Sequence, residues 1–324
     1  MIESQTPETS VNATMAPEPT AGEAVLAERP APALAPPPSA PETPSEQGVH
    51  RTVIQARSGW QLIDWRELQE YRDLFYFLVW RDVKVRYKQT ILGFGWAIIQ
   101  PFFSMIVFSV VFGNLAKIPS DGVPYPIFAY AALVPWTYFS QAMSDSTGSL
   151  IGNTRLLTKV YFPRLIIPMT PVLAKLVDFA IALGIVGLLM AWFRLPPTWN
   201  VFFLPLLVLL MMLTAAGIGM WLSALAIQYR DVRYAVRFLV TLLMYAAPVV
   251  WPVSLLGERF GPTARLLYGL YPMAGVIEGF RASLLGTVPM PWDLIGMGSI
   301  TALALFLSGA LYFRRMERTF ADVA

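Results

Sequence analysis

Long apolar runs separated by short polar segments make up most of the sequence after residue 90. A helix needs about 20 apolar residues to cross roughly 30 Å of hydrocarbon, because it rises about 1.5 Å per residue. Six segments meet this requirement, and they predict membrane-spanning helices at 92–115, 126–148, 166–192, 201–227, 235–256 and 293–313. We therefore expect an all-α polytopic membrane protein whose transmembrane domain covers residues 91–324.

The first 90 residues have a different pattern. Residues 1–48 hold 10 of the 27 prolines and no aromatic residue, so they cannot bury enough apolar surface to offset the entropy cost of ordering. We expect 1–58 to be a disordered, Pro/Ala/Glu-rich cytoplasmic tail. Residues 59–90 place apolar side chains at helical spacing between charges, which predicts an amphipathic helix in the plane of the lipid headgroups. The alternative is an amphipathic helix packed on soluble protein.

A seventh apolar stretch, 263–285, contains too many charges for a span. Glu278 and Arg281 lie inside it, and each charge costs about 2.5 to 3.5 kcal/mol at mid-membrane. Pro272 interrupts it as well. Residues 257–291 therefore predict a re-entrant or interfacial helical hairpin on the outer face, broken near Tyr271 and Pro272.

The distribution of basic residues predicts the orientation, because lysine and arginine near helix ends stay on the cytoplasmic side. With six spans, one face collects 14 basic residues, from 72–88, 149–165, 228–237 and the C-terminus. The opposite face collects five: Lys117, Arg194, Arg259, Arg265 and Arg281. We expect both termini in the cytoplasm.

The amino-acid composition argues against several classes of function. The chain is 56% hydrophobic and only 14% charged, which disfavours a soluble enzyme. It has no cysteine and one histidine, so it lacks a thiol nucleophile and a zinc site of the usual His/Cys kind. The sequence contains neither a G-x-x-x-x-G-K-[ST] phosphate loop nor a D-x-D triplet. We expect no catalytic residue, no metal and no cofactor in this chain, and no nucleic-acid partner, because its basic residues occur in small groups between apolar runs.

Two polar features of the spans are candidates for a pathway. Lys175 and Asp178 lie three residues apart near the middle of the third span, and they fit either a polar pathway or a structural ion pair. The second span contains Asp145 and aromatic side chains, which can stack on sugar rings or simply pack between helices. Those aromatic candidates are Tyr130, Trp136, Tyr138 and Phe139.

Two connections on the predicted cytoplasmic face carry charges together with aromatic residues, at 153–164 and 228–237. A permease with no motor of its own must receive force through such segments, docked in a cleft of a separate ATPase. The alternative is that these charges only fix the topology.

Four motifs make the chain resemble the permeases of ATP-binding-cassette polysaccharide exporters, of the O-antigen, capsule or teichoic-acid type. They are YRDLFYFLVWRDVKVRYKQTILGFGWAIIQP (71–101), NTRLLTKVYFPRLIIP (153–168), RDV (230–232) and YPMAGVIEGFR (271–281). They occur in the family's order and the resemblance covers roughly residues 58–320. The last motif usually begins Asn-Pro in the family, whereas Tyr271 precedes Pro272 here.

The resemblance implies a homodimer in the inner membrane of a bacterium, joined to two copies of a nucleotide-binding ATPase subunit. That subunit binds ATP and magnesium and drives export of lipid-linked polysaccharide. By the resemblance, an interface helix at the cytoplasmic entrance contains Trp80, Arg81, Asp82, Arg86 and Tyr87. The residues that couple to the ATPase are Asn153, Arg155, Leu156, Lys159, Phe162, Pro163, Arg164, Arg230 and Asp231. The outer gate contains Tyr271, Pro272, Glu278 and Arg281, and second-span aromatics together with first-span residues line the canal.

Two other functions fit parts of the sequence. One is an exporter of drugs or other small lipophiles, against which the polysaccharide-type motifs argue. The other is a membrane glycosyltransferase that uses Asp145, Asp178 or Glu278 as a base.

Overall fold

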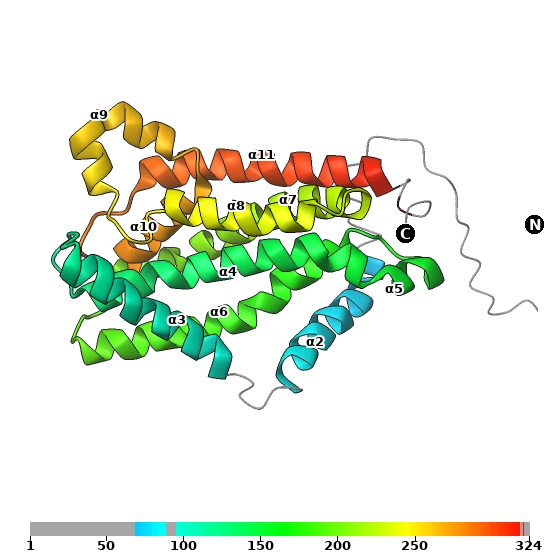
Figure 1. The fold of residues 1–324 in the computed structure, drawn as a ribbon, viewed down its shortest axis with the longest axis horizontal. Helices are drawn as coiled ribbons and strands as arrows, with labels where there is room; N and C mark the ends of the chain where they lie inside the picture. Colours follow the sequence, from blue (N-terminus) through cyan, green and yellow to red (C-terminus); the bar gives the residue numbers. More distant parts are fainter. Residues whose placement is uncertain (1–68, 89–94, 318–319, 321–324) are drawn as a thin grey trace, which may run out of the picture. The chain divides into compact units, whose positions relative to one another are not determined.

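The computed structural model describes residues 69–88, 95–317 and 320, and within them the regular structure is entirely helical, without strands (Figure 1). The predicted tail at 1–58 and the ends of the predicted interface helix lie outside the described residues. The helices are α2 (Arg72–Lys88), α3 (Gly95–Phe108), the π-helical η1 (Ser109–Leu115), α4 (Tyr125–Gly152), α5 (Thr154–Lys159), α6 (Ile166–Trp192), the 3-10 helix η2 (Trp199–Phe203), α7 (Leu204–Gln228), α8 (Val232–Ala246), α9 (Ser254–Tyr268), α10 (Pro272–Leu284) and α11 (Trp292–Met316).

Four helices among the described residues are long and apolar enough to cross a membrane. They are Ile98–Leu115, Ile166–Trp192, Trp199–Gln228 and Trp292–Met316. These four correspond to the first, third, fourth and sixth predicted spans. The structure thus confirms a helix of spanning length at each of those positions.

The predicted second span is α4, which differs from the other four spans in its polarity and in its burial. Its 28 residues extend about 42 Å, enough to cross a bilayer, but its serines, threonines and Asp145 make it less apolar than the other four. Most of its side chains are buried, and it packs mainly on α6 and α7. A helix that other helices surround does not need an apolar surface all round.

The predicted fifth span at 235–256 is wrong as one continuous helix. Helix α8 has 15 residues, about 22 Å, and ends at Ala246, after which Ala247 is extended (φ −78°, ψ 146°). Pro248 and Pro252 lie in the following segment, and proline cannot continue a helical hydrogen-bond ladder. The apolar run therefore continues past the end of the helix.

The predicted break at Tyr271 and Pro272 is confirmed. Tyr271 is extended (φ −84°, ψ 104°) and α10 begins at Pro272, where proline's missing N–H costs no hydrogen bond. A second break lies inside α9, at Gly261 (φ 83°), a conformation that favours glycine. All 13 residues of α10 are buried, between α4, α7 and α11.

Among the described helices, α7 and α11 share the most extensive packing. Gly217 and Gly309 face each other there, and a Cβ on Gly217 would lie 2.7 Å from the main-chain carbon of Leu305. Small residues allow such close backbone packing, which is the usual means of joining helices in a membrane.

Arg281 of α10 holds three parts of the chain together. It is only 1% exposed, and its guanidinium donates to the main-chain oxygens of Val249 (2.8 Å), Trp251 (3.4 Å) and Phe128 (3.4 Å). It also pairs with Glu278 (Nη1 to Oε2, 3.3 Å) and lies 3.5 Å from the centroid of the Phe128 ring. The planar, forked guanidinium makes all these contacts at once, so it joins α10 to α4 and to the segment after α8.

We expect the Arg281→Met variant to be severely destabilised, because it leaves the Glu278 carboxylate buried without its cation. Breaking a buried ion pair from one side costs about 3 to 5 kcal/mol. The midpoint of thermal unfolding in detergent measures the loss. Arg259→Met, at an exposed arginine of α9, is the control and should unfold like the unaltered protein. Equal midpoints for the two variants would contradict the anchoring role of Arg281.

Candidate functional site

A network of charged side chains joins α2, α4 and α6. Its centre is the carboxylate of Asp178, which contacts Arg86 of α2 (Nη1 to Oδ2, 2.8 Å) and Lys175 (Nζ to Oδ2, 3.5 Å). The hydroxyl of Tyr87 donates to the other carboxylate oxygen. The predicted pair of Lys175 and Asp178 is therefore present, and it binds the end of the predicted interface helix.

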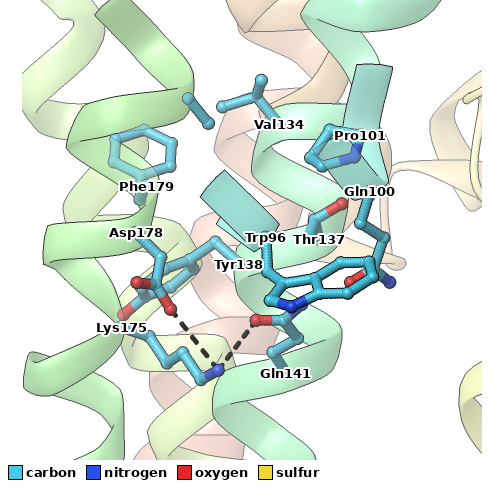
Figure 2. Close-up of a pocket in the computed structure, with 11 residues that line it drawn as sticks. Trp96, Gln100, Pro101, Val134, Thr137, Tyr138, Gln141, Lys175, Asp178 and Phe179 are labelled. Atoms are coloured by element: carbon cyan, nitrogen blue, oxygen red, sulfur yellow. Dashed lines mark hydrogen bonds and ion pairs between the residues drawn. The ribbon is translucent and has the colours of Figure 1, made fainter. Parts of the chain in front are cut away.

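Helix α4 supplies the other half of this network. Asp145 contacts both cations, at 3.4 Å from Lys175 Nζ and 3.6 Å from Arg86 Nη2. Lys175 also donates to Gln141 Oε1 at 2.8 Å (Figure 2). Two cations face two carboxylates, so each charge that leaves water gains a partner of opposite sign. We call these residues the α2–α4–α6 network: Arg86, Tyr87, Gln141, Asp145, Lys175 and Asp178.

A small cavity borders the network. It measures about 30 Å³, enough for about two water molecules and too small for a sugar ring. Figure 2 shows the Trp96 ring on one side of it and Lys175 with Gln141 below. The lining residues are Trp96, Gln100, Pro101, Val134, Thr137, Tyr138, Gln141, Lys175, Asp178, Phe179 and Ala182.

The structure separates the predicted aromatic canal residues. Tyr130, Trp136 and Phe139 are buried in the main core, where the Trp136 and Phe139 rings lie 5.7 Å apart. Tyr138 borders the cavity, and its hydroxyl donates to the main-chain oxygen of Val172 (2.8 Å). In this conformation, Tyr130, Trp136 and Phe139 pack between helices, and only Tyr138 also borders the cavity.

The resemblance placed first-span residues on the canal, but the sequence analysis did not single out Trp96 and Gln100, which line this cavity. The two lie four residues apart on α3, hence on one face, and both are exposed, Trp96 to 56%. A glutamine in an otherwise apolar span was the available signal.

The predicted coupling segment, 153–164, contacts the predicted interface helix. Arg81 of α2 donates to Asn153 Oδ1 (3.0 Å) and pairs with its neighbour Asp82 (2.9 Å). The six-residue α5 follows, with Arg155 and Lys159 exposed and Leu156 half-buried. Two groups of residues that are far apart in sequence therefore lie side by side at one end of the fold.

The second half of this segment reaches the end of α11. Phe162 is buried, Pro163 is half-buried, and Arg164 Nη1 donates to the main-chain oxygen of Glu317 (2.6 Å). The sequence analysis did not predict the role of Glu317.

The remaining residues predicted for the cytoplasmic face are exposed. Arg230 and Asp231 lie in the turn that joins α7 to α8. Trp80 is exposed on α2, and Lys84 Nζ lies 5.4 Å from the centroid of its ring.

The residues predicted for the outer gate lie toward the other end, where Figure 1 shows α9 and α10 far from α5. The Tyr271 hydroxyl donates to the main-chain oxygen of Leu243 (3.2 Å), and Glu278 and Arg281 form the buried pair described above. Pro272 begins α10. Within the part of the chain that the structure describes, no three or more His, Cys, Asp or Glu side chains gather where they could hold a metal ion.

Comparison with known proteins agrees with this architecture. Residues 73–285, about two thirds of the chain, match the ABC-2 type transporter family. The chain belongs to this family. The resemblance drawn from the sequence motifs is thereby confirmed at the level of the family.

The curated relatives are export and transport proteins. The chain is 28% identical over 254 residues to the O-antigen export system permease protein RfbA of Myxococcus xanthus (78% of this chain, 96% of the relative). It is 23% identical over 252 residues to the protein of that name in Klebsiella pneumoniae (78% and 95%). It is 24% identical over 252 residues to the polysialic acid transport protein KpsM of Escherichia coli (73% and 91%).

We expect the α2–α4–α6 network to stabilise the fold through cooperation between its charges. A double-mutant cycle with Arg86→Gln and Asp178→Asn should give an interaction energy of about 1 to 3 kcal/mol, measured from the free energy of unfolding in detergent titrations. The neighbours Arg72 and Asp73 are the control pair: they lie 3.4 Å apart but both are exposed, so their interaction energy should be close to zero. Equal interaction energies in the two cycles would contradict the role given to the network.

Proposed function

We propose that this chain is the membrane-spanning permease subunit of an ATP-driven exporter of lipid-linked polysaccharide, of the O-antigen kind. The family match over residues 73–285 carries the proposal. The relatives support the polysaccharide cargo, since their names describe O-antigen export and polysialic acid transport.

The proposed topology has six passes in the inner membrane, with both termini in the cytoplasm. The length of α4 supports a second pass, and α8 together with the extended segment after it supplies the fifth. Leu78 of α2 and Phe320, near the two ends of the described chain, belong to one buried cluster, which agrees with an even number of passes. The complete burial of α10 supports a re-entrant hairpin over 257–291.

We further propose a homodimer that binds two ATPase subunits. The cavity beside the α2–α4–α6 network is too small for a polysaccharide, and we place the export path between two copies of the chain. Helix α8 presents large exposed side chains at helical spacing that are available for such a contact or for lipid: Tyr234, Phe238, Leu242 and Tyr245.

In this assembly the chain's contribution is conformational. ATP and magnesium bind to the partner subunit, and α5 docks on that subunit through exposed Arg155 and Lys159. Helix α2 lies at the cytoplasmic entrance, with Trp80 exposed. Arg81, which is paired with Asp82, binds Asn153, and Arg86 and Tyr87 bind Asp178 of α6. The hairpin with Tyr271, Pro272, Glu278 and Arg281 serves as the outer gate, with residues 1–58 as a cytoplasmic tail and 91–324 as the permease domain.

The ion pairs argue against the glycosyltransferase alternative. Asp145 and Asp178 both contact Lys175 and Arg86, and Glu278 is paired with Arg281, so each candidate base is held by a cation. The relatives' names argue against a small lipophile as the cargo.

The first test is reconstitution. We expect the purified chain to show no ATPase activity alone, and to export lipid-linked polysaccharide into vesicles once its ATPase partner and ATP are added. Reversing both charges, Arg155→Glu with Lys159→Glu, should reduce export by at least about tenfold while membrane insertion stays intact, because the docking surface changes sign.

Two results would contradict this assignment. One is export by the chain without a nucleotide-consuming partner, and the other is unchanged export in the charge-reversed variant. Arg194→Glu with Arg259→Glu is the matched control, since both arginines are exposed and belong to the predicted outer face. Export by this control should equal that of the unaltered protein.

We also expect Trp96 to contact the moving polysaccharide. Flat aromatic faces stack on the C–H faces of sugars, so Trp96→Ala should slow export about fivefold while Trp96→Phe retains most of it. Trp192→Ala, at an exposed tryptophan at the end of α6, serves as the control. The measurement is the initial rate of export at a fixed ATPase rate, and equal rates for Trp96→Ala and the control would remove Trp96 from the path.

A further inference from the structure

The end of α11 is clamped to the coupling segment by Arg164. The guanidinium donates to the Glu317 main-chain oxygen at 2.6 Å, and the main-chain N–H of Arg164 donates to Glu317 Oε1 at 3.4 Å. Glu317 is the C-cap of α11. The last carbonyl groups of a helix lack partners inside it and carry the negative end of its dipole, so a guanidinium is well suited to this position.

A buried apolar cluster lies beside this clamp. Phe162 from the coupling segment and Phe320 from beyond α11 both belong to it. Phe320 is 1% exposed, and its ring meets that of Phe313 edge to face at 5.3 Å. The cluster also contains Leu78 of α2 and Leu150 of α4. The cytoplasmic-side ends of several helices are thus joined at one point.

The local structure explains why the coupling segment needs such an anchor. Helix α5 has six residues, too few to be stable alone, and the next residue, Val160, is extended (φ −133°, ψ 133°). A displacement of α5 would be absorbed by this extended connection if residues 162–164 were not held. Covalent continuity connects α5 to α4 and α6, whereas the clamp connects it to α11.

We infer that Glu317 and Phe320 are positioning residues for coupling: they anchor residues 162–164 to α11, so that movement of α5 also moves α11. This inference rests on the proposed function, because it assumes that α5 receives force from an ATPase. It adds the C-terminal end of the last helix to the path along which that force travels.

The absence of cysteine from the sequence permits a direct test. In the double variant Arg164→Cys with Glu317→Cys, the clamp is lost. We expect the reduced protein, reconstituted with its ATPase partner, to export about tenfold less polysaccharide per ATP hydrolysed, because a charge-assisted hydrogen bond has been removed. Linking the two thiols with a short bifunctional reagent restores the anchor, so the ratio should return to within about twofold of the unaltered protein.

Two further variants separate positioning from general stability. Phe320→Ala should lower the ratio of export to ATP hydrolysis, and Phe320→Leu should retain it, because leucine still fills the cluster. Arg315→Gln, at an exposed arginine in the last turn of α11, is the matched control and should leave the ratio unchanged.

Three results would overturn the inference: an unchanged ratio in the reduced double variant, thiols that the reagent cannot link, or a linked protein that stays uncoupled. Failure of the proposed function gives a different result, since the unaltered chain would then show no ATP-dependent export at all. The inference alone fails when the unaltered chain exports and the reduced double variant exports at the same ratio.

Discussion

The arrangement of the helices depends on one buried guanidinium. Burying an arginine is costly unless its nitrogens find partners, and each of the three nitrogens of Arg281 donates to a main-chain oxygen. The guanidinium also pairs with the Glu278 carboxylate and lies over the Phe128 ring. Two of those oxygens belong to the segment after α8, where no helix supplies them with hydrogen bonds. The arginine therefore explains two features together: a 13-residue helix can lie inside the fold, and the chain beside it can leave the helical conformation.

The sequence predicted those helices whose position depends only on the length of an apolar run. The third predicted span, 166–192, coincides with α6, and the fourth and sixth differ from the observed helices by a few residues. The prediction failed at α8 because average hydropathy ignores Pro248 and Pro252, which end the helix without making the run less apolar. The break at Pro272 was predictable because there a proline coincides with charged residues that exclude a span.

At the site, the sequence could predict contacts between residues of the same helix but not contacts between helices. Lys175 and Asp178 are three residues apart, so helical geometry alone places them on one face. Arg86, Gln141 and Asp145 come from other helices, and their contacts with this pair depend on how α2, α4 and α6 pack. The same reason applies to Arg164 and Glu317, which are separated by 153 residues. Trp96 and Tyr138 also meet only because α3 packs on α4.

Helix α4 connects the features that these contacts create. The oxygen of Phe128 near its beginning accepts from Arg281, Gln141 and Asp145 near its middle hold Lys175, and Asn153 just beyond its end accepts from Arg81. A buried helix moves as a body because close packing leaves it little freedom to bend. Pro135 lies between the first two contacts and removes one hydrogen bond of the ladder, so bending of α4 concentrates there. A displacement that passes from α5 across the non-helical Asn153 into α4 therefore reaches the α2–α4–α6 network before any proline, whereas it must pass Pro135 to reach Arg281 and α10.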